Sequence, residues 1–207
     1  HDVITAIGFT PHPPLLVPEV ASGAAPELDT LRAACEQLVA DLDAICDSLI
    51  LIGSDQGLAI GRWLLARVGW TSPLLEFDVL AEPVRISAEL SQAMNSDERI
   101  AALVMGDGSA CRSLKAPGYF DERSIDFDDS IAKALSTADA TTLENLDQNL
   151  ATELLAAGGQ VWPFAARVVA TEPQRWRGEL RYRDDPYGVS YFVALWTRVG
   201  IPSTTGP

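Results

Sequence analysis

The sequence is poor in the residues from which many catalytic and metal sites are built. It has three cysteines and two histidines among 207 residues. It also lacks a Cys-x-x-Cys pair, a Gly-x-Gly-x-x-Gly loop and a P-loop. An odd number of cysteines without metal-type spacing predicts a reducing compartment. Cys35 and Cys46 are expected on one face of a helix, as core residues. With the terminal His1 set aside, His12 is the only histidine left.

Positive charge is scarce as well. Lysine and arginine number 15 against 29 aspartates and glutamates, which gives a net charge of −14. Such a surface repels phosphate backbones and anionic lipid, so we expect neither nucleic acid nor a membrane as the main partner. The one arginine-rich stretch, 175–183, is expected to be a solvated strand edge. No apolar run has the length of a membrane span and no secretory signal is predicted, so we expect a cytoplasmic protein.

Apolar runs alternate with helical stripes along the chain, which is typical of an α/β fold. Strands are predicted at 3–9, 48–53, 100–105, 179–183 and 189–199, with a broken edge strand within 74–86. Helices are predicted from about 26 to 49 and at 62–68, 87–94, 126–136, 141–157 and 161–171. The pattern predicts one domain over 1–207, a three-layer α/β/α arrangement whose largely parallel sheet becomes mixed at one edge. Residues 203–207 are expected to form a loose tail.

Polar loops follow three of the predicted strands, where open α/β sheets bind ligands. His12 lies between prolines, which suits a metal ligand or an acid/base group, or a structural histidine bonded to a neighbouring carbonyl. Asp55 could be a metal ligand, an acceptor for substrate or a helix N-cap. The turn 106–109 could cradle an anion or brace the site. No nucleophile elbow supports a triad of Ser109, His12 and an aspartate.

Residues 9–20 (FTPHPPLLVPEV) contain a Pro-His motif directly after the first predicted strand. This segment resembles the opening of the class III extradiol ring-cleavage dioxygenases of the LigB type, in which the histidine of that motif binds Fe(II). Residues 103–110 (LVMGDGSA) are similar to that family's Gly-Asp-Leu-Ser-His turn, and weaker similarity lies at 127–129 and 159–166. The ending 185–191 (DPYGVSY) resembles a functionally unassigned actinobacterial group of this superfamily.

The resemblance implies a degenerate iron site. The family binds iron with two histidines and one carboxylate. His12 matches the first histidine, the second falls on Asp55, and the carboxylate position falls near Gln160. The family's acid/base histidine is replaced by Ala110, a loss of about 10²–10⁴ in rate for deprotonating a catechol. These residues imply either no metal or a weakly bound divalent ion, Fe²⁺, Mn²⁺ or Mg²⁺.

Three functions follow as alternatives. The first is a domain that binds a small, aromatic molecule without ring cleavage, with Glu19, Asp107 and Ser109 as further pocket residues. The second is an active metalloenzyme with a rearranged site, which uses His12, Asp55 and either Asp107 or Glu19. The third is a non-catalytic interaction subunit, in a homo-oligomer or with a partner chain.

Overall fold

The computed structural model describes residues 4–20, 25–81, 88–89, 92, 98–170 and 175–200. Its centre is a six-stranded sheet in the order β3-β2-β4-β1-β6-β5. The strands are β1 (Ile4–Thr10), β2 (Ser48–Gly53), β3 (Leu74–Asp78), β4 (Ile100–Met105), β5 (Trp176–Asp184) and β6 (Tyr191–Arg198). Strands β3, β2, β4 and β1 are parallel, whereas β6 is antiparallel to β1 and forms an antiparallel pair with β5. The predicted parallel sheet with a mixed edge is confirmed.

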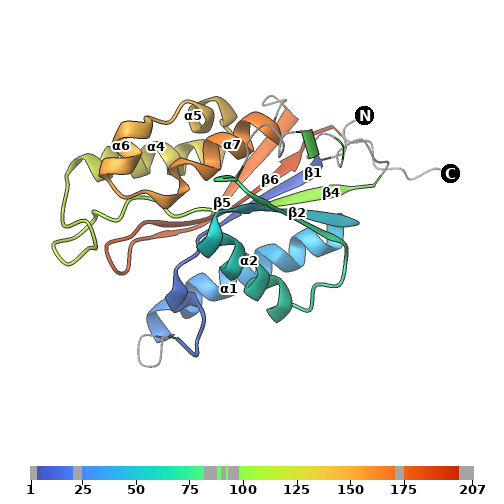
Figure 1. The fold of residues 1–207 in the computed structure, drawn as a ribbon, viewed down its shortest axis with the longest axis horizontal. Coiled ribbons are helices and arrows are strands. Elements are labelled where there is room, and N and C mark those ends of the chain that lie inside the picture. The colour runs from blue at the N-terminus through green and yellow to red at the C-terminus, as the bar shows by residue number, and fades with distance from the viewer. Residues whose placement is uncertain are drawn as a thin grey trace.

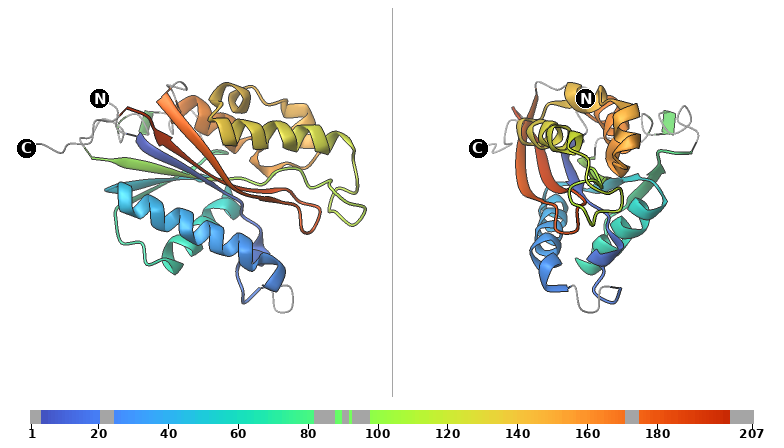
Figure 2. Two further views of the ribbon diagram at one scale, coloured as in Figure 1. Left: turned by 180° about the vertical axis from the view of Figure 1, so that it is seen from behind. Right: turned by 90° about the vertical axis from the view of Figure 1, so that its left-hand side faces the viewer.

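Helices cover both faces of this sheet, as Figure 1 and the right-hand view of Figure 2 show. One face carries α1 (Ala25–Ile45) and α2 (Asp55–Arg67), together with the short 3-10 helix η1 (Pro14–Leu16). The opposite face carries α4 (Arg123–Thr137), α5 (Ala140–Glu144), α6 (Gln148–Glu153), η2 (Ala157–Gly159) and α7 (Val161–Val168). The three-layer α/β/α prediction is therefore confirmed.

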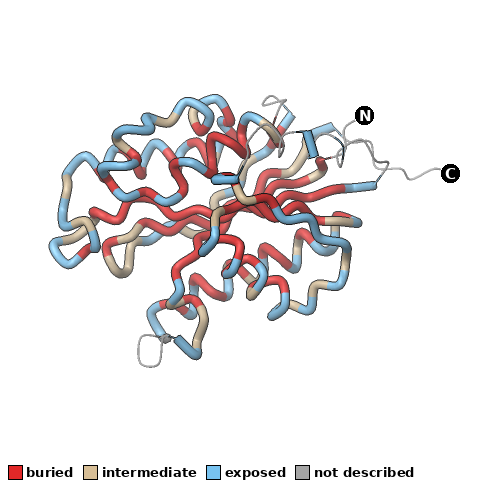
Figure 3. Tube along the Cα trace, viewed as in Figure 1, coloured by how far each residue is buried: buried red, intermediate tan, exposed pale blue. Residues whose placement is uncertain are grey.

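The sheet separates two apolar cores, one under each helical layer. The apolar stripe of α1 lies against the sheet, and its Leu31, Leu38 and Leu42 are fully buried. Each such leucine contributes about 1.5–3 kcal/mol relative to an exposed one. Every residue of β4 is buried because helices cover it on both sides, as Figure 3 shows in red. Cys35 and Cys46 are buried free thiols in the α1–α2 core, as predicted, but Cys46 follows the last residue of α1 and so does not share the helix face with Cys35.

The segment after β2 differs from the prediction. Residues 54–57 were expected to form a loop before a short helix at 62–68, but α2 begins at Asp55, with Ser54 as its N-cap residue. The helix can start this early because Gly57 lets it lie directly on β4. A Cβ at Gly57 would be 3.0 Å from the Cβ of Met105. Gly57, which is typical of a loop in the sequence, thus allows close contact between the helix and the sheet.

The helix expected at 141–157 is divided. Asp139 accepts a hydrogen bond from the backbone N–H of Thr142 and begins α5, and Asp147 accepts one from the N–H of Leu150 and begins α6. Each aspartate satisfies an amide that would otherwise lack a partner in the first turn. Two N-caps eight residues apart therefore give two short helices in place of one long helix.

The remaining predictions agree where the structure describes the chain. The edge strand expected within 74–86 is β3, and α7 corresponds to the helix expected at 161–171. Arg177 and Arg183 are exposed on the edge strand β5, as predicted for the arginine-rich stretch. Most of the helix expected at 87–94 and the tail 203–207 lie outside the described residues. Within the described ranges, the helices are all too short or too polar to cross a membrane.

Candidate functional site at the carboxyl ends of the strands

Two of the predicted polar loops meet at the carboxyl ends of β1 and β4. These strands are parallel neighbours, so the loops that follow them leave the sheet at the same edge. The backbone N–H of His12 donates to Oδ1 of Asp107 at 2.8 Å, and the N–H of Gly106 donates to the carbonyl of Thr10 at 3.0 Å. His12 is 4% exposed and Asp107 is 8% exposed, so both residues of the pair are buried.

The amide of Gln56, in the first turn of α2, contacts both the backbone and the ring of His12. Its Nε2 atom lies 2.9 Å from the carbonyl oxygen of His12 and 3.2 Å from Nδ1 of the ring. The backbone carbonyl can only accept, so the amide end that faces it is the NH₂ group, and its second proton is available to Nδ1. With Nδ1 as an acceptor, the neutral ring carries its own proton at Nε2. Sequence reasoning missed Gln56, because it placed this residue in a loop.

Nε2 of His12 is the reactive position that this arrangement leaves open. The atom is buried and has no hydrogen-bond partner among the described residues. The opposite edge of the ring faces Asp107, whose Oδ2 lies 3.6 Å from Nδ1, too far for a hydrogen bond of ordinary strength. In the tautomer whose Nδ1 accepts from Gln56, His12 presents a buried N–H donor at Nε2.

The buried carboxyl of Asp107 also acts on groups around it. Burial raises the pKa of Asp107 above its ordinary value, and the neighbouring His12 opposes that rise. Burial, and after it the negative charge of Asp107, raises the pKa of the Tyr191 hydroxyl. The pKa of the Cys35 thiol on α1 is also raised, first by burial and then by the negative charges of Glu36 and Asp107. Both of these groups, Tyr191 and Cys35, belong to the α1–α2 core.

The other predicted metal and pocket residues do not join His12. Asp55 is exposed at the start of α2, and Glu19 is exposed after η1. Gln160 is exposed beside α7, where it lines a separate pocket of about 450 Å³. The pocket is lined by Val79, Leu80, Glu144, Leu146, Gln148, Gln160, Pro163 and Arg167. Within the described ranges, no three His, Cys, Asp or Glu side chains are grouped in a way that could hold a metal ion.

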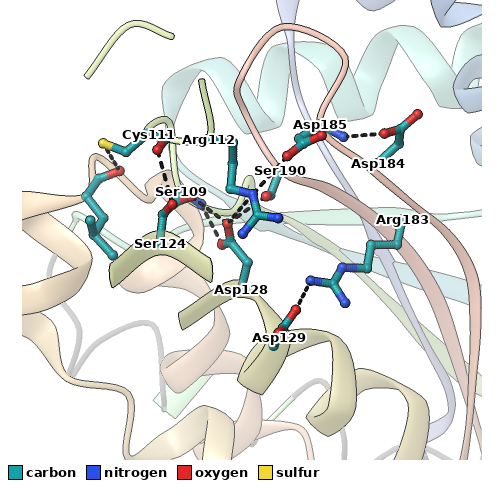
Figure 4. A network of polar contacts seen from close by, with 11 residues as sticks. Ser109, Cys111, Arg112, Ser124, Asp128, Asp129, Arg183, Asp184, Asp185 and Ser190 are labelled. Carbon is teal, nitrogen blue, oxygen red and sulfur yellow. Dashed lines mark hydrogen bonds and ion pairs between the residues drawn. The ribbon is translucent and has the colours of Figure 1, made fainter. Parts of the chain in front are cut away.

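Ser109 belongs to a buried network centred on Asp128 of α4, shown in Figure 4. Asp128 is fully buried, and its Oδ1 accepts the backbone N–H of Ser109 at 2.9 Å. Its Oδ2 accepts the hydroxyl of Ser109 at 2.5 Å and the hydroxyl of Ser190 at 2.6 Å. Nε of Arg112 lies 3.8 Å from the same oxygen and 2.8 Å from Asp185. The network joins the β4 loop, α4 and the β5–β6 hairpin.

These bonds show that the turn 106–109 is a brace. The N–H groups of Gly106, Gly108 and Ala110 donate to Thr10, Ser190 and Leu154, so they are not available to an anion. The Ser109 hydroxyl donates to Asp128. The network holds the loop that carries Asp107 and thereby positions the partner of His12.

The residues present do not fit the iron centre that the resemblance implies. A histidine that binds a metal through one ring nitrogen usually donates the N–H of the other to a carboxylate or carbonyl. At His12, the amide NH₂ of Gln56, itself a donor, lies 3.2 Å from Nδ1, and within the described ranges no three His, Cys, Asp or Glu side chains are grouped to hold a metal ion. Ala110, at the position of the acid/base histidine, is buried and cannot titrate.

Comparison with known proteins gives no assignment for the chain. No protein-family model matches it, and the search of curated proteins found no significant match.

Proposed function

We propose that this chain is a small-molecule-binding domain of the extradiol dioxygenase type that does not cleave aromatic rings. In this proposal, the Nε2–H group of His12 donates a hydrogen bond to an oxygen of the ligand. The observation that carries it is the double hydrogen bond from Gln56, which directs the ring proton to Nε2. The LigB-type resemblance supports an aromatic ligand with phenolic oxygens.

The energetics of the buried donor support a ligand at this position. A buried N–H without an acceptor costs about 1–3 kcal/mol. An oxygen of a bound molecule would regain that energy, which corresponds to about 5- to 150-fold in affinity. Prolines on both sides of His12 and the bond from its backbone N–H to Asp107 hold the imidazole in place. A pre-positioned donor binds without a further ordering cost.

The tautomer of His12 is the direct test. Long-range ¹H–¹⁵N correlation spectra of ring-labelled protein at pH 8 should show His12 protonated at Nε2 and unprotonated at Nδ1. Only two histidines are present, so comparison with His12→Ala assigns the signals. A ring protonated at Nδ1 would contradict the proposal, because Nε2 would then be free to bind a metal.

Ligand binding is tested by titration calorimetry with catechol. We expect binding that weakens about tenfold or more in His12→Ala, the loss expected for one buried hydrogen bond. Gln160→Ala serves as the matched control, because Gln160 lines the separate pocket beside α7. An affinity that drops in Gln160→Ala and not in His12→Ala would place the ligand in that pocket and refute a role for His12.

One observation favours an active metalloenzyme as the second candidate. Asp107 Oδ2 lies only 3.6 Å from Nδ1, so a small shift would let Nδ1–H donate to this carboxylate and free Nε2 for a metal. Elemental mass spectrometry of protein prepared without chelator, and of protein reconstituted anaerobically with Fe²⁺, separates the two. Near-stoichiometric metal that His12→Ala abolishes, together with oxygen uptake on catechol, would favour the enzyme.

A further inference from the structure

We propose that the ligand oxygen bound by His12 belongs to an anion, a carboxylate or phosphate group that sits at the N-terminus of α2. This inference rests on the proposed function. It specifies that the bound small molecule is negatively charged.

The first turn of α2 has backbone donors without acceptors. The first helical bond is from the N–H of Leu58 to the carbonyl of Ser54 at 2.7 Å. The Ser54 side chain makes no capping hydrogen bond. No described residue accepts from the N–H groups of Asp55, Gln56 and Gly57. Three parallel amides at the start of a 13-residue helix favour a negative group through their hydrogen bonds and the helix dipole.

His12 supplies a fourth donor at the same place. Its Cδ2 atom lies 3.4 Å from the position that a Cβ on Gly57 would occupy, so this edge of the ring packs against the first turn of α2. Nε2 is bonded to Cδ2, so this atom, which has no hydrogen-bond partner among the described residues, also lies near the first turn of α2. The His12 side chain is only 5% exposed, which makes its N–H a desolvated donor. An anion here would receive a buried side-chain bond together with backbone bonds.

The charges around the site are compatible with an anion. Asp107 lies on the Nδ1 edge of the ring, whereas the proposed position is at Nε2. Asp55 is exposed, so solvent screens much of its negative charge.

Arg32 of α1 adds a positive charge on the same face of the sheet. Its side chain is 8% exposed, and its Nε donates to the carbonyl of Leu16, four residues after His12, at 2.7 Å. Its Nη1 donates to Asp29, whereas its Nη2 is buried and has no hydrogen-bond partner in the part of the chain that the structure describes. The loop that carries His12 therefore has a buried cation with an open donor beside it.

A pair of matched probes tests the charge. Benzoate and benzamide have nearly the same shape, but only benzoate is an anion at pH 7. In titrations at low ionic strength without chloride, we expect benzoate to bind about tenfold or more tightly than benzamide. Catechol and inorganic phosphate are titrated alongside. Benzoate should also shift the ring N–H resonance of His12 in the labelled protein.

Variants of the same helix locate the site. His12→Ala should weaken benzoate about tenfold. Asp55→Asn should tighten benzoate about two- to fivefold, because it removes the carboxylate next to the amides. Arg62→Gln is the matched control, since Arg62 is an exposed residue further along α2 that pairs with Glu76. Its affinity for benzoate should stay within about twofold of the unmodified chain.

The outcomes separate the two proposals. Catechol binding with equal affinities for benzoate and benzamide would overturn the anion site and leave the proposed function standing. Failure of catechol, benzoate and benzamide to bind would overturn the proposed function, and with it an aromatic acid as the ligand. Phosphate binding that His12→Ala abolishes would still support the anion site, with a phosphorylated ligand. Benzoate binding that is the same in His12→Ala and leaves the His12 resonance unmoved would refute this location.

Discussion

Replacing Asp128 with alanine removes the acceptor at the centre of the buried network that joins the β4 loop, α4 and the β5–β6 hairpin. The carboxylate is fully buried and accepts three hydrogen bonds, from the N–H and hydroxyl of Ser109 and the hydroxyl of Ser190. Arg112 adds a positive group 3.8 Å away. In Asp128→Ala, three donors and part of a guanidinium charge lose their acceptor at once.

The expected cost follows from these contacts. A hydrogen bond to a charged group contributes about 1.5–3 kcal/mol, and a buried donor left without an acceptor costs about 1–3 kcal/mol. The two hydroxyls can rotate towards other acceptors, but the backbone N–H of Ser109 cannot. Arg112 keeps its ion pair with Asp185, which limits the electrostatic loss. We therefore expect Asp128→Ala to lower the free energy of unfolding by about 3–5 kcal/mol.

Equilibrium unfolding in urea, followed by circular dichroism at pH 7, measures this difference. Asp129→Ala is the matched control, because the neighbouring Asp129 is exposed and pairs with Arg183 at the surface. That variant should lose less than about 1 kcal/mol. If the two variants lost the same amount, or if Asp128→Ala lost less than about 1 kcal/mol, the brace would not stabilise the fold as we argue.

Three further results are expected. Gly178→Ala should lower the free energy of unfolding in urea by about 2 kcal/mol or more, because its Cβ would lie 2.6 Å from the carbonyl oxygen of Leu135. Gly69→Ala, whose Cβ has no described atom within 4 Å, should cost about 1 kcal/mol because of the positive φ at that position. Equal losses in the two variants would contradict the tight contact between α4 and β5. The Thr142 hydroxyl and backbone N–H hold the pKa of Asp139 below its usual value of 3.8. The ionised Asp139 therefore stabilises the fold above that pH, and this stabilisation is lost as the pH falls through the lowered pKa. Asp139→Asn should therefore flatten the fall in the urea midpoint below about pH 4, and an unchanged slope would refute this cap. Burial raises the pKa of Cys46 to about 11, so a thiol reagent at pH 8 should label it only after unfolding, and rapid labelling of the native protein would place it outside the core.

The central strands could be predicted from the sequence with their observed bounds. Both β2 and β4 are continuous apolar runs, because helices cover them on two faces, and such runs end where burial ends. The start of α2 could not be predicted in this way. Gly57 is a loop signal when read locally, and its role depends on the distance to Met105, which lies on another strand. The two N-caps Asp139 and Asp147 were readable as helix starts, but the apolar pattern across them suggested one helix.

The candidate site was predictable only in its general position. Three polar loops after three parallel strands indicate a shared edge, which the contact of His12 with Asp107 illustrates. Gln56, which contacts both the ring and the carbonyl of His12, is an unremarkable amide in the sequence, and this contact depends on the first turn of a helix that was not predicted. The pairing of Ser109 with Asp128 was likewise hidden, since short polar side chains carry no periodic pattern that would reveal a buried partner.

The position of β6 beside β1 has a consequence for how the chain is made. Of the six strands, β1 leaves the ribosome first and β6 last, yet Nε of Arg198 donates to the carbonyl of Ile4 across 194 residues of sequence. Until β6 emerges, the nascent chain can pair β1 with β4 on one side only, and the other edge of this apolar strand stays open. An open apolar edge is a template for pairing with another chain. A ribosome that stalls before residue 191 would therefore hold an aggregation-prone intermediate, and only the last strand closes it.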